Sequence, residues 1–99
     1  MWFFCQRRNV RPSEQRVASL KQHLTWMKEQ HELGTIVLSG PSPDRQLGMY
    51  LIRAASRADA ERIASGDPYT VAGDTAYELT EWQINEIMGV GFRNLDDLR

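Results

Sequence analysis

Two short apolar runs constrain the fold of this 99-residue chain more than any other feature. Residues 36–38 (Ile-Val-Leu) and residues 49–52 (Met-Tyr-Leu-Ile) contain no polar residue that would divide them into an inward and an outward face. Strands without such alternation are typically covered on both faces. A chain of this length builds one core. We therefore predict one domain whose central strands need a covering layer on each side.

The remaining segments predict an α+β domain. Strands are expected at residues 2–5, 35–39, 47–54 and 75–82, and helices at residues 14–33 and 57–65. Ser13 and Ser56 are the expected N-caps, and Gly34 and Gly66 the expected helix ends. In the second helix we expect Ala60, Ile63 and Ala64 to face inward, and in the last strand Tyr77 and Leu79 to share one face. The order of these elements predicts a ferredoxin-like βαββαβ fold, in which a four-stranded antiparallel sheet carries both helices on one face.

Two helices can cover only one face of such a sheet. Because the apolar runs predict cover on both faces, the second face needs a partner, and another copy of the chain is the simplest one. We therefore predict a homodimer that packs sheet against sheet. We assign residues 1–83 to the folded domain and residues 84–99 to a short helix near residues 84–88 followed by a polar tail.

The first helix has an apolar stripe with intervals of three, four and three residues. This spacing predicts a face that packs on the sheet. At 100° per residue, His31 falls near the middle of the stripe, His23 on its shoulder and Trp26 further round. The stripe consists of Val17, Leu20, Leu24 and Met27.

Charge and cysteine content exclude several classes of function. The chain has 12 basic and 13 acidic residues, with a net charge of -1 and no long run of either sign, which argues against binding to nucleic acid or to a membrane surface. No apolar run approaches the roughly 20 residues of a spanning helix. Cys5 is the single cysteine, so it forms no intrachain disulfide; we expect a small buried side chain in a cytoplasmic protein. We also expect no metal site, because His23 and His31 are eight residues apart and not i, i+4.

The segment Gly66-Asp67-Pro68 places a carboxylate in a stiff turn. A glycine in the left-handed region would end the helix, and the proline would prevent the helix from resuming. This turn would fix the direction of Asp67. An aspartate before proline commonly bonds only its local backbone, so a structural role and a role in a site both stay open.

His23 is the first candidate for chemistry, because an imidazole exchanges protons near neutral pH. A carboxylate such as Asp67 could orient it, as the third member does in catalytic triads. The alternative is a helix residue bonded to backbone or water. For His31, near the helix end, we favour a structural role.

Further candidates surround these two residues. Gly40 would let a ligand approach the backbone closely, although the segment Ser39-Gly40-Pro41 could equally be only a turn. Ser39 lacks the Gly-x-Ser-x-Gly context of a nucleophile. Four aromatic residues could line a small pocket or could simply belong to the core: Trp26, Tyr50, Tyr69 and Trp82.

The chain resembles the YCII-related family, including its DGPF-type members, from about residue 2 to residue 82. The features that carry the resemblance are His23-Leu24, Gly34, Leu38-Ser39-Gly40-Pro41, Ala60-Glu61, Asp67-Pro68-Tyr69, Ala72-Gly73 and Trp82. The resemblance implies a ferredoxin-like fold that dimerises into a barrel-like assembly. It also implies that His23 and Asp67 form an active-site pair beside a small pocket.

Two hypotheses follow from the residues and the resemblance together. In the first, the chain is a small cofactor-independent enzyme of elimination or isomerisation type, in which His23 moves a proton on a small organic ligand and Asp67 orients the imidazole. Ser39, Gly40, Pro41, Pro68 and Tyr69 would bind that ligand. In the second, the same pocket belongs to a non-catalytic binding or assembly module. The family is similar in fold to muconolactone isomerases and small cofactor-free monooxygenases, but fold similarity transfers chemistry poorly.

Overall fold

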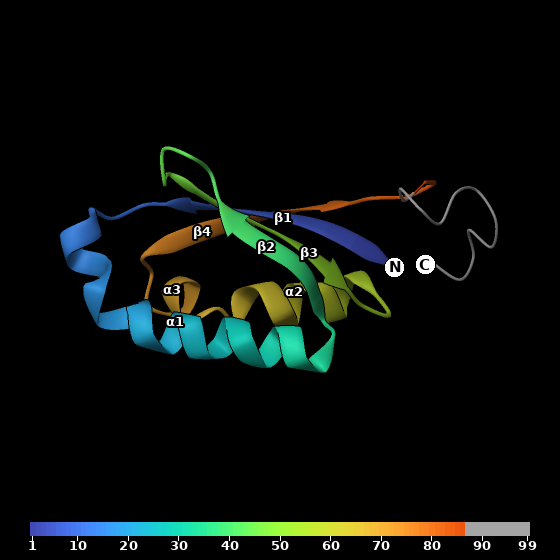
Figure 1. Ribbon diagram of the computed structural model, residues 1–99, viewed down its shortest axis with the longest axis horizontal. Coiled ribbons are helices and arrows are strands. Elements are labelled where there is room, and N and C mark those ends of the chain that lie inside the picture. The colour runs from blue at the N-terminus through green and yellow to red at the C-terminus, as the bar shows by residue number, and fades with distance from the viewer. Residues whose placement is uncertain (87–99) are drawn as a thin grey trace.

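The computed structural model describes residues 1–86 and has the predicted βαββαβ order with one short additional helix (Figure 1). The sheet order is β2-β3-β1-β4, and every neighbouring pair is antiparallel. All three helices lie on one face of the sheet (Figure 1). The ferredoxin-like prediction is confirmed. The elements are β1 (Trp2–Asn9), α1 (Ser13–Leu33), β2 (Ile36–Pro41), β3 (Leu47–Arg53), α2 (Arg57–Ser65), α3 (Pro68–Val71) and β4 (Thr75–Glu81).

The core lies between the sheet and the helices. Cys5 pairs with Tyr50 in β3 and with Leu79 in β4, so these three residues share the face that the helices cover. From α2, Ala60 and Ala64 are fully buried and Ile63 packs against this core, as predicted. The small side chains of the two alanines let α2 lie close to the sheet. Cys5 is buried, which is also as predicted.

Strand β1 is longer than predicted. It continues from Trp2 through Asn9, although the polar character of residues 6–9 predicts a loop there. Pairing with β3 on one side and β4 on the other satisfies its backbone groups and overrides the polar sequence. Because side chains alternate along a strand, Arg7 shares the helix-covered face with Phe3 and Cys5.

Strand β2 differs from the prediction in two ways. It extends through Gly40 and Pro41, for which the sequence predicts a turn, and it is an edge strand and not a central one. Pro41 is tolerated there because an edge strand does not use every N–H. The apolar run at residues 36–38 contains a register shift, so its residues divide between the two faces.

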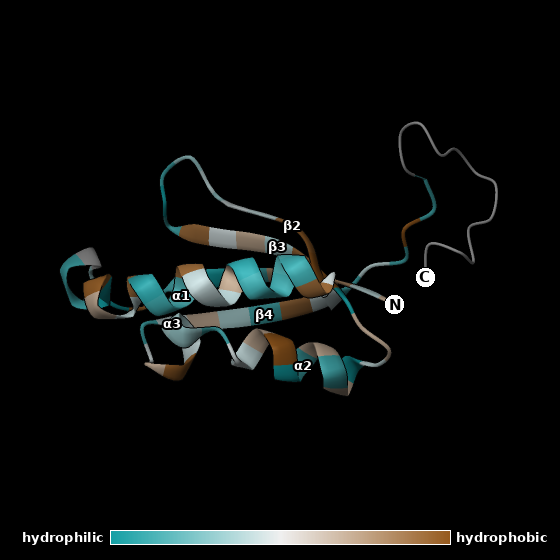
Figure 2. Ribbon diagram, turned by 60° about the horizontal axis from the view of Figure 1, so that its bottom comes forward, coloured by the Kyte–Doolittle hydropathy of each residue, from teal (hydrophilic) through white to brown (hydrophobic). Residues whose placement is uncertain are grey.

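Helix α1 presents a different face to the sheet from the one predicted. Ser19 and His23 are buried and Trp26 is half-buried against the core, whereas Val17 and Leu24 are exposed. The outward surface of α1 is mainly hydrophilic (Figure 2). Leu20, Leu24 and Met27 instead border a cavity between α1 and the β2–β3 hairpin, which explains why an apolar stripe does not point at the sheet.

Several helix ends also differ from expectation. Helix α1 begins at Ser13 itself, with Pro12 as N-cap, so the expected cap at Ser13 is wrong; Gly34 does end the helix, at φ 76°. Ser56 caps α2 as predicted, with its side chain accepting from the Asp59 N–H. Gly66 has φ −82° and is right-handed, because the chain turns directly into α3. Residues 84–86 are not helical, and the rest of the predicted helix and tail lies outside the described residues.

Within residues 1–86, no helix combines the length and the apolar character that crossing a membrane requires.

Candidate active site

Asp67 lies where α2 passes into α3, and this junction holds its carboxylate in place. Pro68 occupies the first turn of α3, where its missing N–H costs nothing, and Asp67 is the N-cap. Its Oδ1 accepts the backbone N–H of Tyr69 at 3.0 Å. The side chain is fully buried. The prediction that this segment aims Asp67 therefore holds, although the segment is a helix start and not an open turn.

His23 reaches Asp67 from the middle of α1. Its Nδ1 lies 2.8 Å from Oδ1 of Asp67, and both side chains are buried. A carboxylate only accepts hydrogen bonds, so Nδ1 carries the proton and donates it. In the neutral imidazole, Nε2 then keeps its lone pair. The predicted contact between His23 and Asp67 is confirmed.

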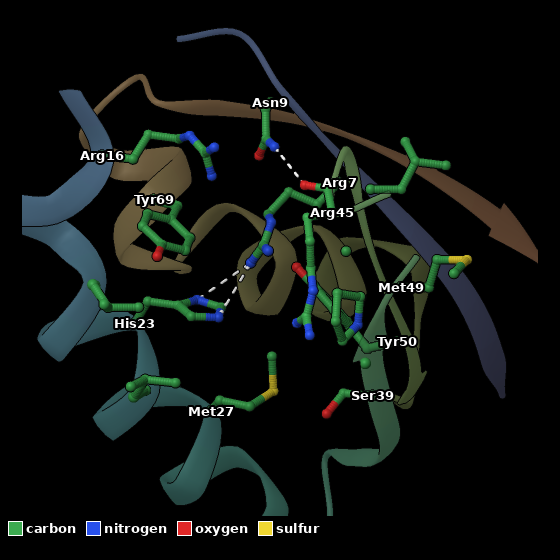
Figure 3. A pocket seen from close by; sticks show the side chains of 16 residues that line it. Arg7, Asn9, Arg16, His23, Met27, Ser39, Arg45, Met49, Tyr50 and Tyr69 are labelled. Atoms are coloured by element: carbon green, nitrogen blue, oxygen red, sulfur yellow. Dashed lines mark hydrogen bonds between the residues drawn. The ribbon is translucent and has the colours of Figure 1, made fainter. Parts of the chain in front are cut away.

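Arg7 is a third member of this cluster that the sequence did not single out. Its Nη1 donates to Oδ2 of Asp67 at 2.8 Å. The same atom lies 3.3 Å from both ring nitrogens of His23. The two lone-pair directions of an imidazole diverge, so an atom equidistant from both nitrogens lies off both directions, and its hydrogen bond to Nε2 is long and bent (Figure 3). Gly48 makes room for Arg7, since a Cβ there would lie 2.5 Å from its guanidinium.

The cluster keeps Asp67 ionised. Burial on its own would raise the pKa of Asp67, but the hydrogen bonds and charges of His23 and Arg7 outweigh it and lower the pKa below its ordinary value of 3.8. At neutral pH the carboxylate is therefore charged and holds the imidazole in one tautomer.

Aromatic rings pack around the imidazole. The Tyr69 ring stacks on His23 with centroids 4.4 Å apart, and the Arg7 guanidinium lies 5.0 Å from the Tyr69 ring centroid. These contacts restrict the His23 ring to one orientation. Cys5 lies deeper, and burial raises its pKa to about 11, so the thiol stays protonated and is a poor nucleophile.

His23 borders a cavity of about 360 Å³ between α1 and the β2–β3 hairpin (Figure 3). Four of the residues that the sequence proposed for ligand binding line this cavity: Ser39, Gly40, Pro41 and Tyr69. Pro68 and Asp67 are not among the described residues that line it, and Asp67 bonds His23, which does line it. Ser39 also bonds the exposed His31, at 2.8 Å from its Nε2. Of the four aromatic candidates, Tyr50 and Tyr69 line the cavity, whereas Trp26 and Trp82 do not.

The sequence was compared with models of known protein families. The model of the YCII-related domain matches residues 1–83 of the chain. The chain belongs to the YCII-related family. No curated protein matches the sequence. Among solved structures, this YCII-related chain is similar to 5-chloro-2-hydroxyhydroquinone dehydrochlorinase (TftG) from Burkholderia phenoliruptrix AC1100, in complex with 2,5-dihydroxybenzoquinone. The TM-score is 0.69 and the identity 22%, over 83% of this chain and 93% of that one, a likeness that shows the shared fold.

The site of this YCII-related protein contains residues that sequence reasoning passed over. Arg7 could have been found from the sequence. If the predicted first strand is extended by two residues, Arg7 points to the same face as Phe3 and Cys5, and a charged side chain on a covered face requires a buried partner. Arg16 and Arg45 also line the cavity, but they carry no comparable signal, since only the fold brings them together.

No group of three or more His, Cys, Asp or Glu side chains that could hold a metal ion occurs in the described part of this YCII-related chain. The residues of the cluster provide an imidazole with a fixed tautomer, whose Nε2 accepts only the long hydrogen bond from Arg7 among the described residues, and a cavity beside it. Such an arrangement can accept and return protons.

Proposed function

We propose that this protein is a small enzyme that catalyses proton transfer on a small organic ligand, leading to elimination or isomerisation. The observation that carries the proposal is the buried pair of His23 and Asp67 beside the cavity, with Nδ1 of His23 held 2.8 Å from the carboxylate. Buried, oriented histidines next to a cavity are the usual form of a general base.

The proposed step begins when Nε2 of His23 takes a proton from a C–H or O–H group of the ligand. The electron pair left behind forms a new double bond. In an elimination, the leaving group departs with its own bonding pair; in an isomerisation, the imidazolium returns the proton to another atom of the ligand. Asp67 stays ionised throughout and stabilises the imidazolium. In the elimination, the imidazolium then releases its proton to water, so both reactions regenerate His23 and Asp67 without an oxidant or reductant.

The structural relative supports elimination as the first reaction to test. It is a dehydrochlorinase, and removal of hydrogen chloride requires a group that accepts a proton. Its complex holds a small oxygenated ring, 2,5-dihydroxybenzoquinone. A cavity of about 360 Å³ has the volume for a ligand of that class.

Hydrogen–deuterium exchange tests the proposal without a known substrate. The protein would be incubated in D₂O with a panel of small phenols, chlorinated hydroquinones and lactones, and loss of C–H signals would be followed by proton NMR. We expect catalysed exchange or halide release with at least one ring class, and His23→Asn should abolish it. Saturable binding across the panel with neither exchange nor release would overturn the enzyme proposal in favour of a binding module.

We further propose that the chain is a homodimer formed through the open sheet face. Phe4 and Leu38 are each paired with Leu51 and so lie on the face opposite the helices. Leu38 is 62% exposed, and the half-exposed Trp82 packs edge-on against Phe4 at 6.3 Å. Exposed apolar side chains that adjoin one another on an uncovered sheet face are typical of an interface.

A substitution at Leu38 tests the dimer. We expect light scattering to give a dimer mass for the wild type at micromolar concentration, and Leu38→Lys to shift it toward the monomer because a lysine would be buried unpaired. Val71→Lys is the matched control, since Val71 is 73% exposed on α3, on the other side of the sheet. A wild-type monomer would contradict the prediction.

A further inference from the structure

The cavity beside His23 is lined by positive charge. Three of its lining residues are arginines, namely Arg7, Arg16 and Arg45, and none of the described lining residues is Asp or Glu. The three side chains project toward the same space from β1, α1 and the β2–β3 turn (Figure 3). The whole chain has a net charge of -1, so this concentration of positive charge is local.

Arg7 does not account for this charge, because Asp67 neutralises it. Arg16 and Arg45 have no ion pair with a carboxylate within residues 1–86. The Arg16 side chain and the Arg45 backbone are nevertheless held in place. Arg16 donates its Nε–H to the backbone carbonyl of Arg11 at 3.1 Å. The carbonyl of Arg45 accepts from the Asn9 side chain at 2.9 Å, and Arg45 has the left-handed φ of 65°.

Tyr50 lines the same cavity and carries a hydroxyl that is buried in this structure. The residue is 2% exposed, and its hydroxyl has no hydrogen-bond partner among the described residues. The Cys5 thiol, a weak hydrogen-bonding group, lies beside it, and the charges of Asp67 and Arg7 also act on it. Burial raises the pKa of Tyr50, so the hydroxyl stays protonated at neutral pH and can donate. A buried donor with no better acceptor than a thiol costs free energy, which a ligand oxygen would recover.

We propose that the cavity binds its ligand as a small ring-containing oxyanion, a carboxylate or an ionised phenol, recognised by Tyr50, Arg16 and Arg45. The ligand oxygens would accept from the Tyr50 hydroxyl and from the two guanidinium groups. The ring would lie on the apolar side chains of α1 that border the cavity, Leu20, Leu24 and Met27.

A role of these donors in catalysis, beyond ligand binding, rests on the proposed function. If His23 removes a proton from such a ligand, negative charge increases on the ligand oxygens. The donors that bind the anion would then stabilise that charge in the transition state, as an oxyanion hole does. Tyr50, Arg16 and Arg45 are thus specificity residues for binding and stabilising residues for the proposed reaction.

Binding of simple probes tests the inference. Benzoate and 2,4-dinitrophenolate carry the two kinds of oxyanion, and benzamide is the neutral analogue of benzoate. Each would be titrated against the ¹⁵N-labelled protein at constant ionic strength, with amide shifts as the readout. We expect at least one anion to saturate the cavity amides and benzamide to bind about tenfold more weakly or worse, because hydrogen bonds to charged groups are the stronger ones. The tighter anion then identifies the preferred head group.

Charge-removing variants assign the binding to the proposed residues. Arg16→Gln and Arg45→Gln should each weaken binding of the anion about tenfold, and Tyr50→Phe should weaken it while leaving the spectrum folded. Arg62→Gln is the matched control, because it removes the same charge from α2, outside the cavity. Added sodium chloride should also weaken wild-type binding.

Several results would overturn the inference: benzamide binding as tightly as both anions, Arg62→Gln weakening binding as much as the cavity variants, or no saturable shift with either anion. These failures are distinguishable from failure of the proposed function. If the protein bound the anions but catalysed neither exchange nor halide release, the enzyme proposal would be wrong and the anion proposal would stand. Exchange on neutral ligands only, unaffected by Arg16→Gln and Arg45→Gln, would remove the anion proposal alone.

Discussion

His23→Asn should lower the rate of proton transfer by about 10²–10⁴-fold on the ligand that the exchange screen identifies. The asparagine amide can still donate to Asp67, which accepts from His23 at 2.8 Å in the wild type, but it has no basic nitrogen to face the cavity. The variant thus keeps the buried hydrogen bond and loses the base. The measurement is the initial rate of exchange or halide release under saturating ligand.

His31→Asn is the matched control for this experiment. It removes the other histidine of the same helix, which is exposed and whose side chain bonds only Ser39 among the described residues. We expect this variant to retain its rate within a few-fold. Equal losses in both variants, or an unchanged rate in His23→Asn, would show that His23 is not the base.

Asp67→Ala should have the largest effect on stability of any single substitution in the site. It removes the acceptor for three donors, namely the His23 ring, the Arg7 guanidinium and the Tyr69 N–H. Arg7, whose side chain is 11% exposed, would keep its charge without a partner. Breaking a buried ion pair in this way typically costs about 3–5 kcal/mol of unfolding free energy. Asp67→Asn should cost less, because the amide oxygen can still accept.

Urea unfolding followed by tryptophan fluorescence at pH 7 measures this loss. Glu29→Ala serves as the control, because it removes one negative charge from an exposed position on α1. We expect the control to change the unfolding free energy by a small fraction of the Asp67→Ala effect. Similar effects of the two substitutions would contradict the proposed importance of the cluster.

The contribution of Asp67 should depend on pH in one direction. Its pKa in the folded chain lies below the ordinary value of 3.8, so the ionised form favours folding. This stabilisation is complete above pH 3.8 and is lost as the pH falls through the folded pKa. The amide introduced by Asp67→Asn cannot titrate, so the difference in unfolding free energy between wild type and this variant should narrow in acid. If the difference in unfolding free energy between wild type and Asp67→Asn stayed constant from pH 7 to pH 3, the lowered pKa of Asp67 would be excluded.

The residues of the proposed pair show how far sequence reasoning reaches. Asp67 is identifiable from its local chain, since a carboxylate between Gly66 and Pro68 has a direction set by neighbours. His23 is selected with it only because the family resemblance pairs the two positions. Periodicity alone predicts that a different side of α1 packs on the sheet, and it places His31 nearer than His23 to the centre of that side. The reason is that an apolar stripe beside a cavity has the same spacing as one that packs on a sheet.

The sequence by itself determined the order of the four strands and the two longer helices, the inward face of α2 and the position of Asp67, because each depends on neighbours a few residues apart. Only the tertiary structure decided that β1 continues through Arg7 to Asn9, since its polar residues are held by pairing with β3 and β4, which are distant in the sequence. It also decided that Arg7, Arg16, Arg45 and Tyr50 surround one cavity. Contacts between distant segments depend on how the elements pack, and a local sequence pattern does not predict them.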